Sequence, residues 1–511
     1  MKHRALHRRA ALRSLIRTLV RSAWLAPAAL VASCAVGPNY HRPAATVTPM
    51  YKENQGWKPA NPQPIPADQP WWSIYNDPVL DGLERQVIVN NQTLKEAEAA
   101  YRAAQAVVGV DRGSLFPDIG ATGSASYSGE ARGALRSETG GGAGSAGTTT
   151  GVYVPGYTRT TTYSAGLQAT WELDIWGRIR RQVESDKDRA QASAADVAAA
   201  LLSAQVSLAE DYFQMRAAEQ EMRMYDTYLK DLENALEITQ NQVRAGITTL
   251  ADVYQAQTQL ENTQVSDINV QLTRATYEHA IATLTGKAPE QLSLAQGDFA
   301  TTVPVVPVGV PSDLLERRPD IAGAERTMAS ENALIGVADA AWFPDLTLTG
   351  SVGFSNSTLG RLIGASNSLW SLGPSVSETI FNGGARYYQT REARANYDQA
   401  VATYRQTVLA AFQSVENDLV TLRVLEQSQG LQVTAVGAAR LSEQLTLNQY
   451  KSGIVSFTSV ITAQTTRLAS EISLLAIQNQ QLVASVDLVS QTGGGWSASE
   501  LQLADRGVPK N

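Results

Sequence analysis

Cys34 is the only cysteine in a chain of 511 residues, and its surroundings predict a modified thiol. It follows the small residues Val31-Ala32-Ser33 and a leader with seven basic side chains, no acid and a short apolar run at 23–32. A basic segment followed by a short apolar run is typical of an export signal. The run is too short to span a bilayer as a helix. Small residues before a lone cysteine are typical of a bacterial lipobox. We predict that residues 1–33 are a lipoprotein signal peptide and that Cys34 carries acyl chains such as palmitate; a buried structural thiol is the alternative.

Few other residues are of a type that catalyses reactions or binds metals. The chain after the leader contains only two histidines, His41 and His279, and a single cysteine excludes any disulfide within one copy. The sequence has no glycine-rich phosphate-binding loop. Because an enzyme needs titratable groups gathered in one concave site, we predict no catalytic activity, no metal site and no cofactor.

Charge limits the class of partner. Without the leader the chain has 35 basic and 49 acidic residues, a formal net charge of −14. Proteins bind nucleic acid largely by placing Lys and Arg against phosphates. No nucleic-acid partner is therefore expected.

Long segments without helix-breaking residues dominate the rest of the chain. Residues 179–245 contain neither Gly nor Pro, and Gly246 separates them from a second such run at 247–285. Two more runs follow: residues 385–452 have no Pro and only Gly430 and Gly437, and residues 454–492 have neither Gly nor Pro. A helix of 67 residues would be about 100 Å long at 1.5 Å per residue. Each pair of runs predicts an antiparallel helical hairpin, which must find neighbours because a bare hairpin cannot bury its apolar stripe.

Four shorter segments alternate between apolar and polar residues, as strands with two different faces do. In residues 163–175 every odd position is apolar or aromatic and every even one is small or polar. Residues 119–127, 346–355 and 370–381 follow the pattern less strictly. A transmembrane strand needs about 9 to 11 residues in this order, although a soluble sheet with one wet face has the same pattern. Residues 129–162 are rich in Gly, Ser and Thr and predict a flexible loop.

Both patterns occur twice because the chain contains an internal repeat. Phe116-Pro117-Asp118 returns as Phe343-Pro344-Asp345 at an offset of 227, whereas Gly177 returns as Gly384 at an offset of 207. The difference of 20 residues falls inside the Gly/Ser/Thr loop. Strands and hairpins therefore keep their lengths while the loop varies, as expected of a loop in solvent.

These features divide the chain into six parts. We predict a signal peptide (1–33), a lipid-anchored extended segment (34–79), a first repeat (80–302), an extended linker (303–319), a second repeat (320–495) and a C-terminal tail (496–511). Each repeat consists of a leading helix (81–112 or 320–340), two strands and one long hairpin.

Four strands predict an oligomer. In lipid, the unpaired edges of an open sheet would leave backbone groups unsatisfied at several kcal/mol each. Single-chain barrels start at about eight strands, so several copies must share one wall. Small inward residues such as Ser, Thr and Gly favour a wide, wet lumen, which favours three copies and twelve strands over two copies and eight.

Four stretches carry a family resemblance. They are Cys34-Ala35-Val36-Gly37-Pro38-Asn39-Tyr40, Trp71-Trp72 with Asp77-Pro78, Leu173-Asp174-Ile175-Trp176-Gly177-Arg178, and Pro311-Ser312-Asp313-Leu314-Leu315-Glu316-Arg317-Arg318-Pro319-Asp320-Ile321. In these stretches the chain resembles the TolC-like outer-membrane factors, in particular the lipoprotein branch of OprM and the NodT-type proteins. The resemblance implies a mainly helical homotrimer with a twelve-stranded barrel in the outer membrane and a periplasmic tunnel of helical hairpins. Ala35 after the cysteine resembles lipoproteins that are sorted to the outer membrane.

The resemblance also implies a function. Proteins of this family give a passive exit duct through which a tripartite efflux system expels drugs, metals or other small solutes. The implied partners are a periplasmic adaptor and an inner-membrane pump. An outer-membrane duct of a type I protein secretion system shares the architecture and is the alternative. A purely structural coiled-coil protein would leave the four strands and the lipobox unexplained.

Site residues are implied at the hairpin ends. Gly246-Ile247 and Gly453-Ile454 take the place of the tips that dock with the adaptor; alternatively, these glycines only end helices. Asp252 takes the place of an acid at the periplasmic gate, where three copies would attract cations; alternatively, it is a solvated acid beside a helix start. Ser459 and Thr462 stand where relatives carry further aspartates, which weakens the case for a strongly cation-selective gate.

Overall fold

The computed structural model describes residues 35–44, 50–54, 70–136, 152–304, 306 and 314–501. The predicted signal peptide, Cys34 and residues 502–511 lie outside this part of the chain. The chain divides into two compact units, one containing the sheet and the other most of the helices.

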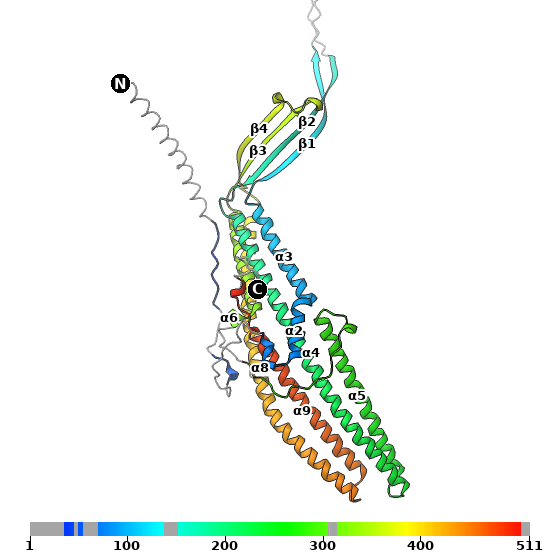
Figure 1. Ribbon diagram of the computed structural model, residues 1–511. Coiled ribbons are helices and arrows are strands. Elements are labelled where there is room, and N and C mark those ends of the chain that lie inside the picture. The colour runs from blue at the N-terminus through cyan, green and yellow to red at the C-terminus, as the bar shows by residue number, and fades with distance from the viewer. Residues whose placement is uncertain are drawn as a thin grey trace, which may run out of the picture. The chain divides into compact units, whose positions relative to one another are not determined.

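The helices and strands follow one another as two repeats (Figure 1). The first repeat contains α2 (Pro78–Asn90), α3 (Gln92–Gly113), β1 (Asp118–Arg136), β2 (Val152–Glu172), α4 (Arg178–Arg244) and α5 (Leu250–Leu284). The second contains α6 (Leu314–Arg317), α7 (Pro319–Ala340), β3 (Asp345–Asn356), β4 (Ser368–Ser377), α8 (Ala385–Lys451) and α9 (Phe457–Gln491). The predicted fold class, mainly helical with long hairpins and four strands, is confirmed.

The two hairpins match in length. Helices α4 and α8 each contain 67 residues, and α5 and α9 each contain 35. Their ends are related by the same offset of 207 residues that the sequence motifs show. Gly430 and Gly437 lie inside α8 without interrupting it.

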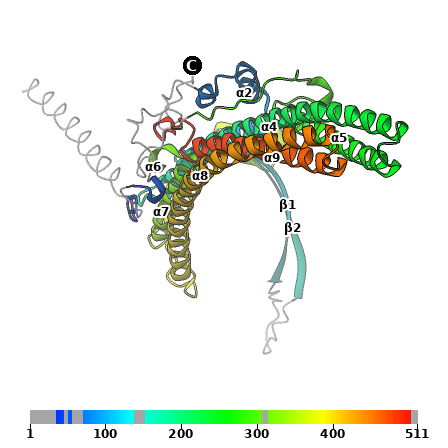
Figure 2. The same ribbon diagram turned by 90° about the horizontal axis from the view of Figure 1, so that it is seen from below.

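Apolar side chains hold the two hairpins together. Tyr228 and Leu232 of α4 pack with Leu260 of α5 and Leu468 of α9 in one buried cluster. The hairpins accordingly lie side by side (Figure 2). This contact supplies the neighbour that a long amphipathic hairpin needs.

The four strands form one antiparallel sheet in the order β1-β2-β3-β4. The prediction of a loop over 129–162 was wrong at both ends, because β1 and β2 pair along their whole length as far as Arg136 opposite Val152. Residues 152–162 contain Val, Tyr and Thr, which favour strands. Residues 129–136 favour strands less, but pairing with β2 extends the antiparallel ladder through them.

Two strands end earlier than their alternating patterns do. β2 ends at Glu172 because the carboxylate of Asp174 accepts hydrogen bonds from the backbone N–H of Ile179 (3.1 Å) and Arg180 (2.9 Å), which starts α4. β4 ends at Ser377, and the Arg386 guanidinium of α8 donates to the carbonyl of Thr379 (2.9 Å). In both places the residues after the strand form hydrogen bonds with the first turn of the next helix.

The first leading helix is broken, contrary to the single helix predicted over 81–112. Asn91, between α2 and α3, adopts an extended backbone with ψ of 128°. Its side-chain oxygen accepts from the N–H of Leu94 (2.9 Å), and its amide donates to the carbonyl of Leu284 at the end of α5 (2.9 Å). An asparagine that caps a new helix and binds another helix end stabilises the break.

Residues 496–501 are folded, although the sequence assigns them to a tail. The N–H of Ala498 donates to the carbonyl of Glu316 (2.8 Å). Leu501 packs with Ala195 and Ala322 in a small apolar cluster.

Candidate functional site

The ends of the two hairpins have the same backbone. Gly246 and Gly453 both have φ of 73°. The N–H of Ile247 donates to the carbonyl of Gln242 (2.8 Å), and the N–H of Ile454 donates to that of Gln449 (2.9 Å). A left-handed residue followed by this bond is the Schellman ending of a helix, which glycine adopts without strain.

Helix-ending bonds alone do not mark a docking site, because α5 and α9 end in the same way at Gly286 and Gly493. The difference lies in the surroundings. A Cβ added to Gly286 or Gly493 would lie 2.5 or 2.1 Å from a backbone oxygen, whereas at Gly246 or Gly453 it would meet nothing within 4 Å. Ile247 and Ile454 are 73% and 72% exposed. The predicted tip residues thus form exposed apolar turns.

Side chains beyond the turns differ between the hairpins. Leu250 at the start of α5 is 61% exposed, whereas Phe457, the equivalent residue of α9, is 3% exposed. Phe457 packs with Val460, Ile461 and Ala256 between the hairpins. The two ends therefore share a backbone but present different surfaces.

Asp252 caps the start of α5. Its Oδ2 accepts from the hydroxyl of Thr248, from the hydroxyl of Thr249 (3.0 Å) and from the N–H of Thr249 (3.2 Å). These bonds, the one from Thr248 first, lower the pKa of this carboxyl below its ordinary value. The residue is thus a charged acid in the first turn of α5, where the helix dipole favours negative charge.

The other two predicted gate residues lie on α9. The hydroxyl of Ser459 is 3.4 Å from that of Ser456, the residue before the helix. The hydroxyl of Thr462 donates to the carbonyl of Thr458 (2.9 Å) within the helix. Neither side chain carries charge, so Asp252 is the only ionised member of this set.

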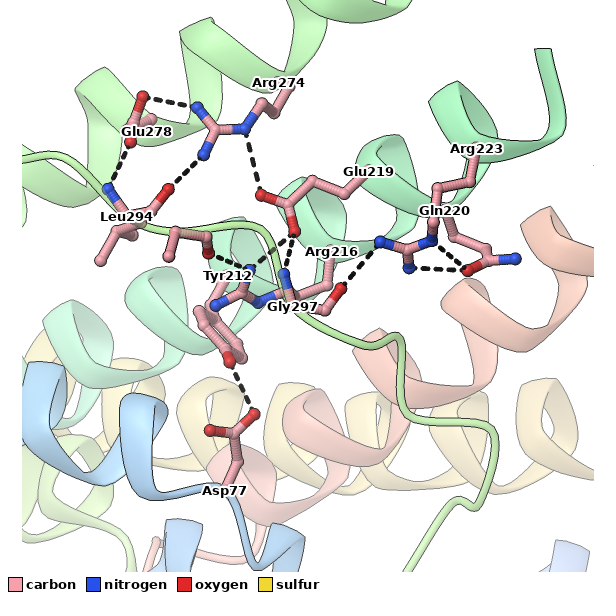
Figure 3. A network of polar contacts seen from close by, with 11 residues as sticks. Asp77, Tyr212, Arg216, Glu219, Gln220, Arg223, Arg274, Glu278, Leu294 and Gly297 are labelled. Atoms are coloured by element: carbon pink, nitrogen blue, oxygen red, sulfur yellow. Dashed lines mark hydrogen bonds and ion pairs between the residues drawn. The ribbon is translucent and has the colours of Figure 1, made fainter. Parts of the chain in front are cut away.

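A buried ionic network fastens residues 292–300, here called the strap, across α4 and α5 (Figure 3). The carboxylate of Glu219 accepts from Arg216 (2.7 Å), from Arg274 (3.1 Å) and from the N–H of Gly297 (3.0 Å). Glu219 is fully buried. Because each charge has a partner, the network can exist away from water.

The strap makes further polar contacts through its carbonyls. Arg216 donates to Ala295 (2.8 Å), Arg223 to Gly297 (3.0 Å) and Arg274 to Leu294 (2.6 Å). Sequence reasoning missed this network. The spacing of Arg216 and Glu219 by three residues hints at a pair on one helix face, but nothing in the sequence indicates that a distant coil segment completes it.

The residues after Cys34 are held tightly. The N–H of Val36 donates to the carbonyl of Trp176 (2.9 Å), and the buried guanidinium of Arg181 donates to the carbonyl of Val36 (3.2 Å). A Cβ on Gly37 would lie 2.4 Å from the Cα of Gly336 in α7. The segment that follows the predicted lipidation site is therefore fixed beside the turn between β2 and α4.

Several carboxyl groups of the helices are shifted by burial. Desolvation raises the pKa of Glu84 to about 9 and is the main cause that raises the pKa of Glu210 to about 8 and of Asp418 to about 7. Proximity to Asp487 adds to the shift at Glu210 and Asp418. Among the described residues, no three His, Cys, Asp or Glu side chains lie together as metal ligands would.

The sequence profile of outer membrane efflux proteins matches residues 83–287 and 310–494, which cover most of both repeats. The chain belongs to the outer membrane efflux protein family. It is 29% identical over 470 residues to the toluene efflux pump outer membrane protein TtgC of Pseudomonas putida, with 91% of this chain and 94% of TtgC covered. It is 30% identical to the pyoverdine export outer membrane protein OpmQ of Pseudomonas aeruginosa, with 85% and 89% covered.

Solved structures of outer membrane efflux channels have the same fold. The outer-membrane channel OprN superposes with a TM-score of 0.81 at 29% identity, covering 91% of this chain and all of OprN. CusC superposes with a TM-score of 0.75 at 24% identity, covering 90% of this chain. The predicted outer-membrane location is confirmed by this membership.

Proposed function

We propose that this protein is the outer-membrane exit duct of a tripartite efflux system for small solutes. One observation carries the proposal: an efflux-family chain supplies two equal hairpins and a four-stranded sheet with two open edges. That combination is a segment of a tube. Three relatives are named for the export of toluene, cations and pyoverdine, which favours efflux over type I protein secretion.

The tube is completed by three identical copies. Four strands cannot close a barrel, and the free edges of β1 and β4 would be costly in lipid. Twelve strands give a wide wall with a wet lumen. The sheet pattern agrees, since hydroxyls of Ser124 and Ser164 (2.7 Å) and of Ser351 and Ser371 (2.8 Å) meet on one face.

Partners act at the hairpin ends. A periplasmic adaptor docks on Gly246, Ile247, Gly453 and Ile454, where the turns leave apolar side chains in solvent. An inner-membrane pump supplies the energy for export, because a passive duct has no energy source of its own. The duct itself needs neither catalysis nor a cofactor. Asp252, with Ser459 and Thr462, lies beside these turns and forms the periplasmic gate.

Acyl chains on Cys34 anchor the N-terminus to the outer membrane. A lipid chain contributes about 0.8 kcal/mol per buried methylene. The predicted division of the chain, from the signal peptide at 1–33 to the second repeat at 320–495, is part of the same proposal; residues 496–501 of the predicted tail pack against this repeat and the first one. Cys34→Ser should abolish incorporation of labelled palmitate.

Susceptibility testing of a deletion strain is the experiment that tests the function. Deletion should lower tolerance to drugs or metals, and the intact gene should restore it. Gly453→Glu should fail to restore tolerance although the protein remains an assembled trimer, because a charged side chain at the tip interferes with the adaptor.

Two controls separate docking from folding, because any side chain at Gly453 strains a backbone with φ of 73°. Gly453→Ala introduces this strain without the charge and should restore tolerance. Gly437 lies inside α8, where an added Cβ meets nothing within 4 Å, so Gly437→Glu adds the same charge away from the tip. It should restore tolerance as the parent does. Full restoration by Gly453→Glu would contradict docking at the tip, and unchanged tolerance in the deletion strain would contradict efflux.

A further inference from the structure

We propose that β4 of one copy pairs with β1 of the next copy in one defined antiparallel register, in which Ser375 faces Ser124 of the next copy. The inference rests on the proposed assembly of identical copies into one duct, which is incomplete without this contact. It goes further by naming the pairs of residues that close the wall.

The internal repeat preserves strand pairing to the residue. Asp118 faces Thr170 in the β1–β2 pair. The offsets of 227 for the first strand and 207 for the second convert this pair into Asp345 and Ser377, which face each other in the β3–β4 pair. The serine pairs on the sheet face follow the same rule, with hydroxyl distances of 2.7 and 2.8 Å. The two hairpins of the sheet are therefore equivalent.

The junction between the hairpins then predicts the junction between copies. β2 and β3 pair from Tyr163 opposite Asn356 to Glu172 opposite Thr347, with Gln168 opposite Ser351. In a closed ring of equivalent hairpins, β4 takes the place of β2 and β1 of the next copy takes the place of β3. Applying the two offsets to Gln168 and Ser351 gives Ser375 and Ser124. The same step pairs Leu372 with Tyr127, Val376 with Gly123 and Ser371 with Ser128 of the next copy.

Side-chain chemistry supports this register independently. Leu372, Val376 and Tyr127 are exposed in the single copy, and Trp370 is 80% exposed. The register places Leu372 opposite Tyr127 on one face and serine opposite serine on the other. A slip by one residue would place apolar residues opposite polar ones and reverse the faces. A slip by two keeps the faces, so the experiment must distinguish registers two residues apart.

Cysteine cross-linking makes that distinction. Ser124→Cys with Ser375→Cys is the matched pair; Ser124→Cys with Ser377→Cys and Thr122→Cys with Ser375→Cys are the pairs for slips in either direction. Directly opposed residues lie within disulfide range, whereas diagonal neighbours, about 7 to 8 Å apart, do not. The full-length parent protein, whose only cysteine is Cys34, is the background. Oxidation is carried out in isolated outer membranes, and products are separated without and with reductant.

After oxidation, the matched pair should run as a covalent trimer that reductant converts back to monomer. Both slipped pairs should run as monomers. Ser128→Cys with Ser371→Cys is a second matched pair in case the first variant does not assemble. Preferential cross-linking of a slipped pair, or no cross-linking of either matched pair in a protein that is still trimeric, would overturn the register. Tolerance of unoxidised cells is measured in parallel: matched cross-links without restored tolerance would leave the register standing and contradict the proposed function.

Discussion

Glu84 shows what a single buried residue contributes in this fold. It lies on α2, is fully buried, and its carboxyl oxygens have no hydrogen-bond partner. Burial raises its pKa from 4.5 to about 9, so the folded protein holds it as a neutral acid at pH 7. The unfolded chain, in which this carboxyl is solvated, releases the proton at much lower pH.

Stability should therefore fall as pH rises between about 4.5 and about 9. In that window the folded state binds one more proton at Glu84 than the unfolded state does. The free energy of unfolding therefore falls by about 1.4 kcal/mol for each pH unit. Glu84→Gln removes the titrating group, so its thermal midpoint should change less than that of the parent between pH 6 and pH 9. Glu96→Gln, at an exposed position of α3, is the control and should behave as the parent; identical slopes in all three proteins would contradict this role.

Asp252 combines a helix cap with a fixed charge. Hydrogen bonds from Thr248 and Thr249 lower its pKa, so it stays ionised through the neutral range. In a trimer, three such carboxylates near the hairpin ends should attract cations. Asp252→Asn keeps a capping side chain but removes the charge, and single-channel recording should show a weaker preference for cations. Glu261→Gln, at an exposed site on the same helix, should leave selectivity unchanged; an unaltered preference in Asp252→Asn would remove the gate role.

At the scale of elements, the strap is fastened by Glu219. This carboxylate binds Arg216, Arg274 and the backbone of Gly297. The Arg216 side chain is only 5% exposed. Removal of the acid would leave a buried guanidinium without its main partner, which typically costs about 3–5 kcal/mol.

Glu219→Ala should therefore lower the thermal midpoint and expose the strap to proteases. The control is Glu98→Ala, because Glu98 and Arg102 form an exposed pair at 4.0 Å. Such a pair contributes about 0–1 kcal/mol, so its loss should have little effect. Limited proteolysis followed by mass spectrometry locates the cleavage. Cleavage elsewhere than at residues 292–300, or equal effects of the two variants, would argue against the strap.

At the scale of the whole molecule, the proposed duct predicts an assembly of copies, because the free edges of β1 and β4 would be costly in lipid. Protein extracted in mild detergent should have a polypeptide mass three times that of one mature chain by light scattering. Each copy leaves apolar residues exposed on α5 and α8, including Val265, Leu272, Leu431 and Leu445, which supplies surface for association. A folded monomer, recognised by native helix content at one-fold mass, would contradict the proposed duct.

Periodicity determined the architecture from the sequence because few alternatives fit it. Residues 179–245 have no Gly or Pro, and a helix of this length forms once neighbours cover its apolar stripe. The two offsets predicted which elements are equivalent, and α4 and α8 indeed have equal lengths. The tip glycines were found in the same way, since Gly is the residue that a left-handed helix ending requires.

Only the tertiary structure decided which chemically ordinary residues act together. Asn91 breaks a helix because Leu284, far along the chain, offers it a carbonyl. Glu219 joins α4 to α5 and to the strap because the fold places Arg274 and Gly297 within hydrogen-bond distance of its carboxylate. Leu250 and Phe457 occupy equivalent positions yet differ in burial, because only Phe457 faces the neighbouring hairpin. The local sequence pattern predicts whether a segment is a helix or a strand. It does not predict which distant residues come into contact, because those contacts depend on packing and on the need to pair buried polar groups.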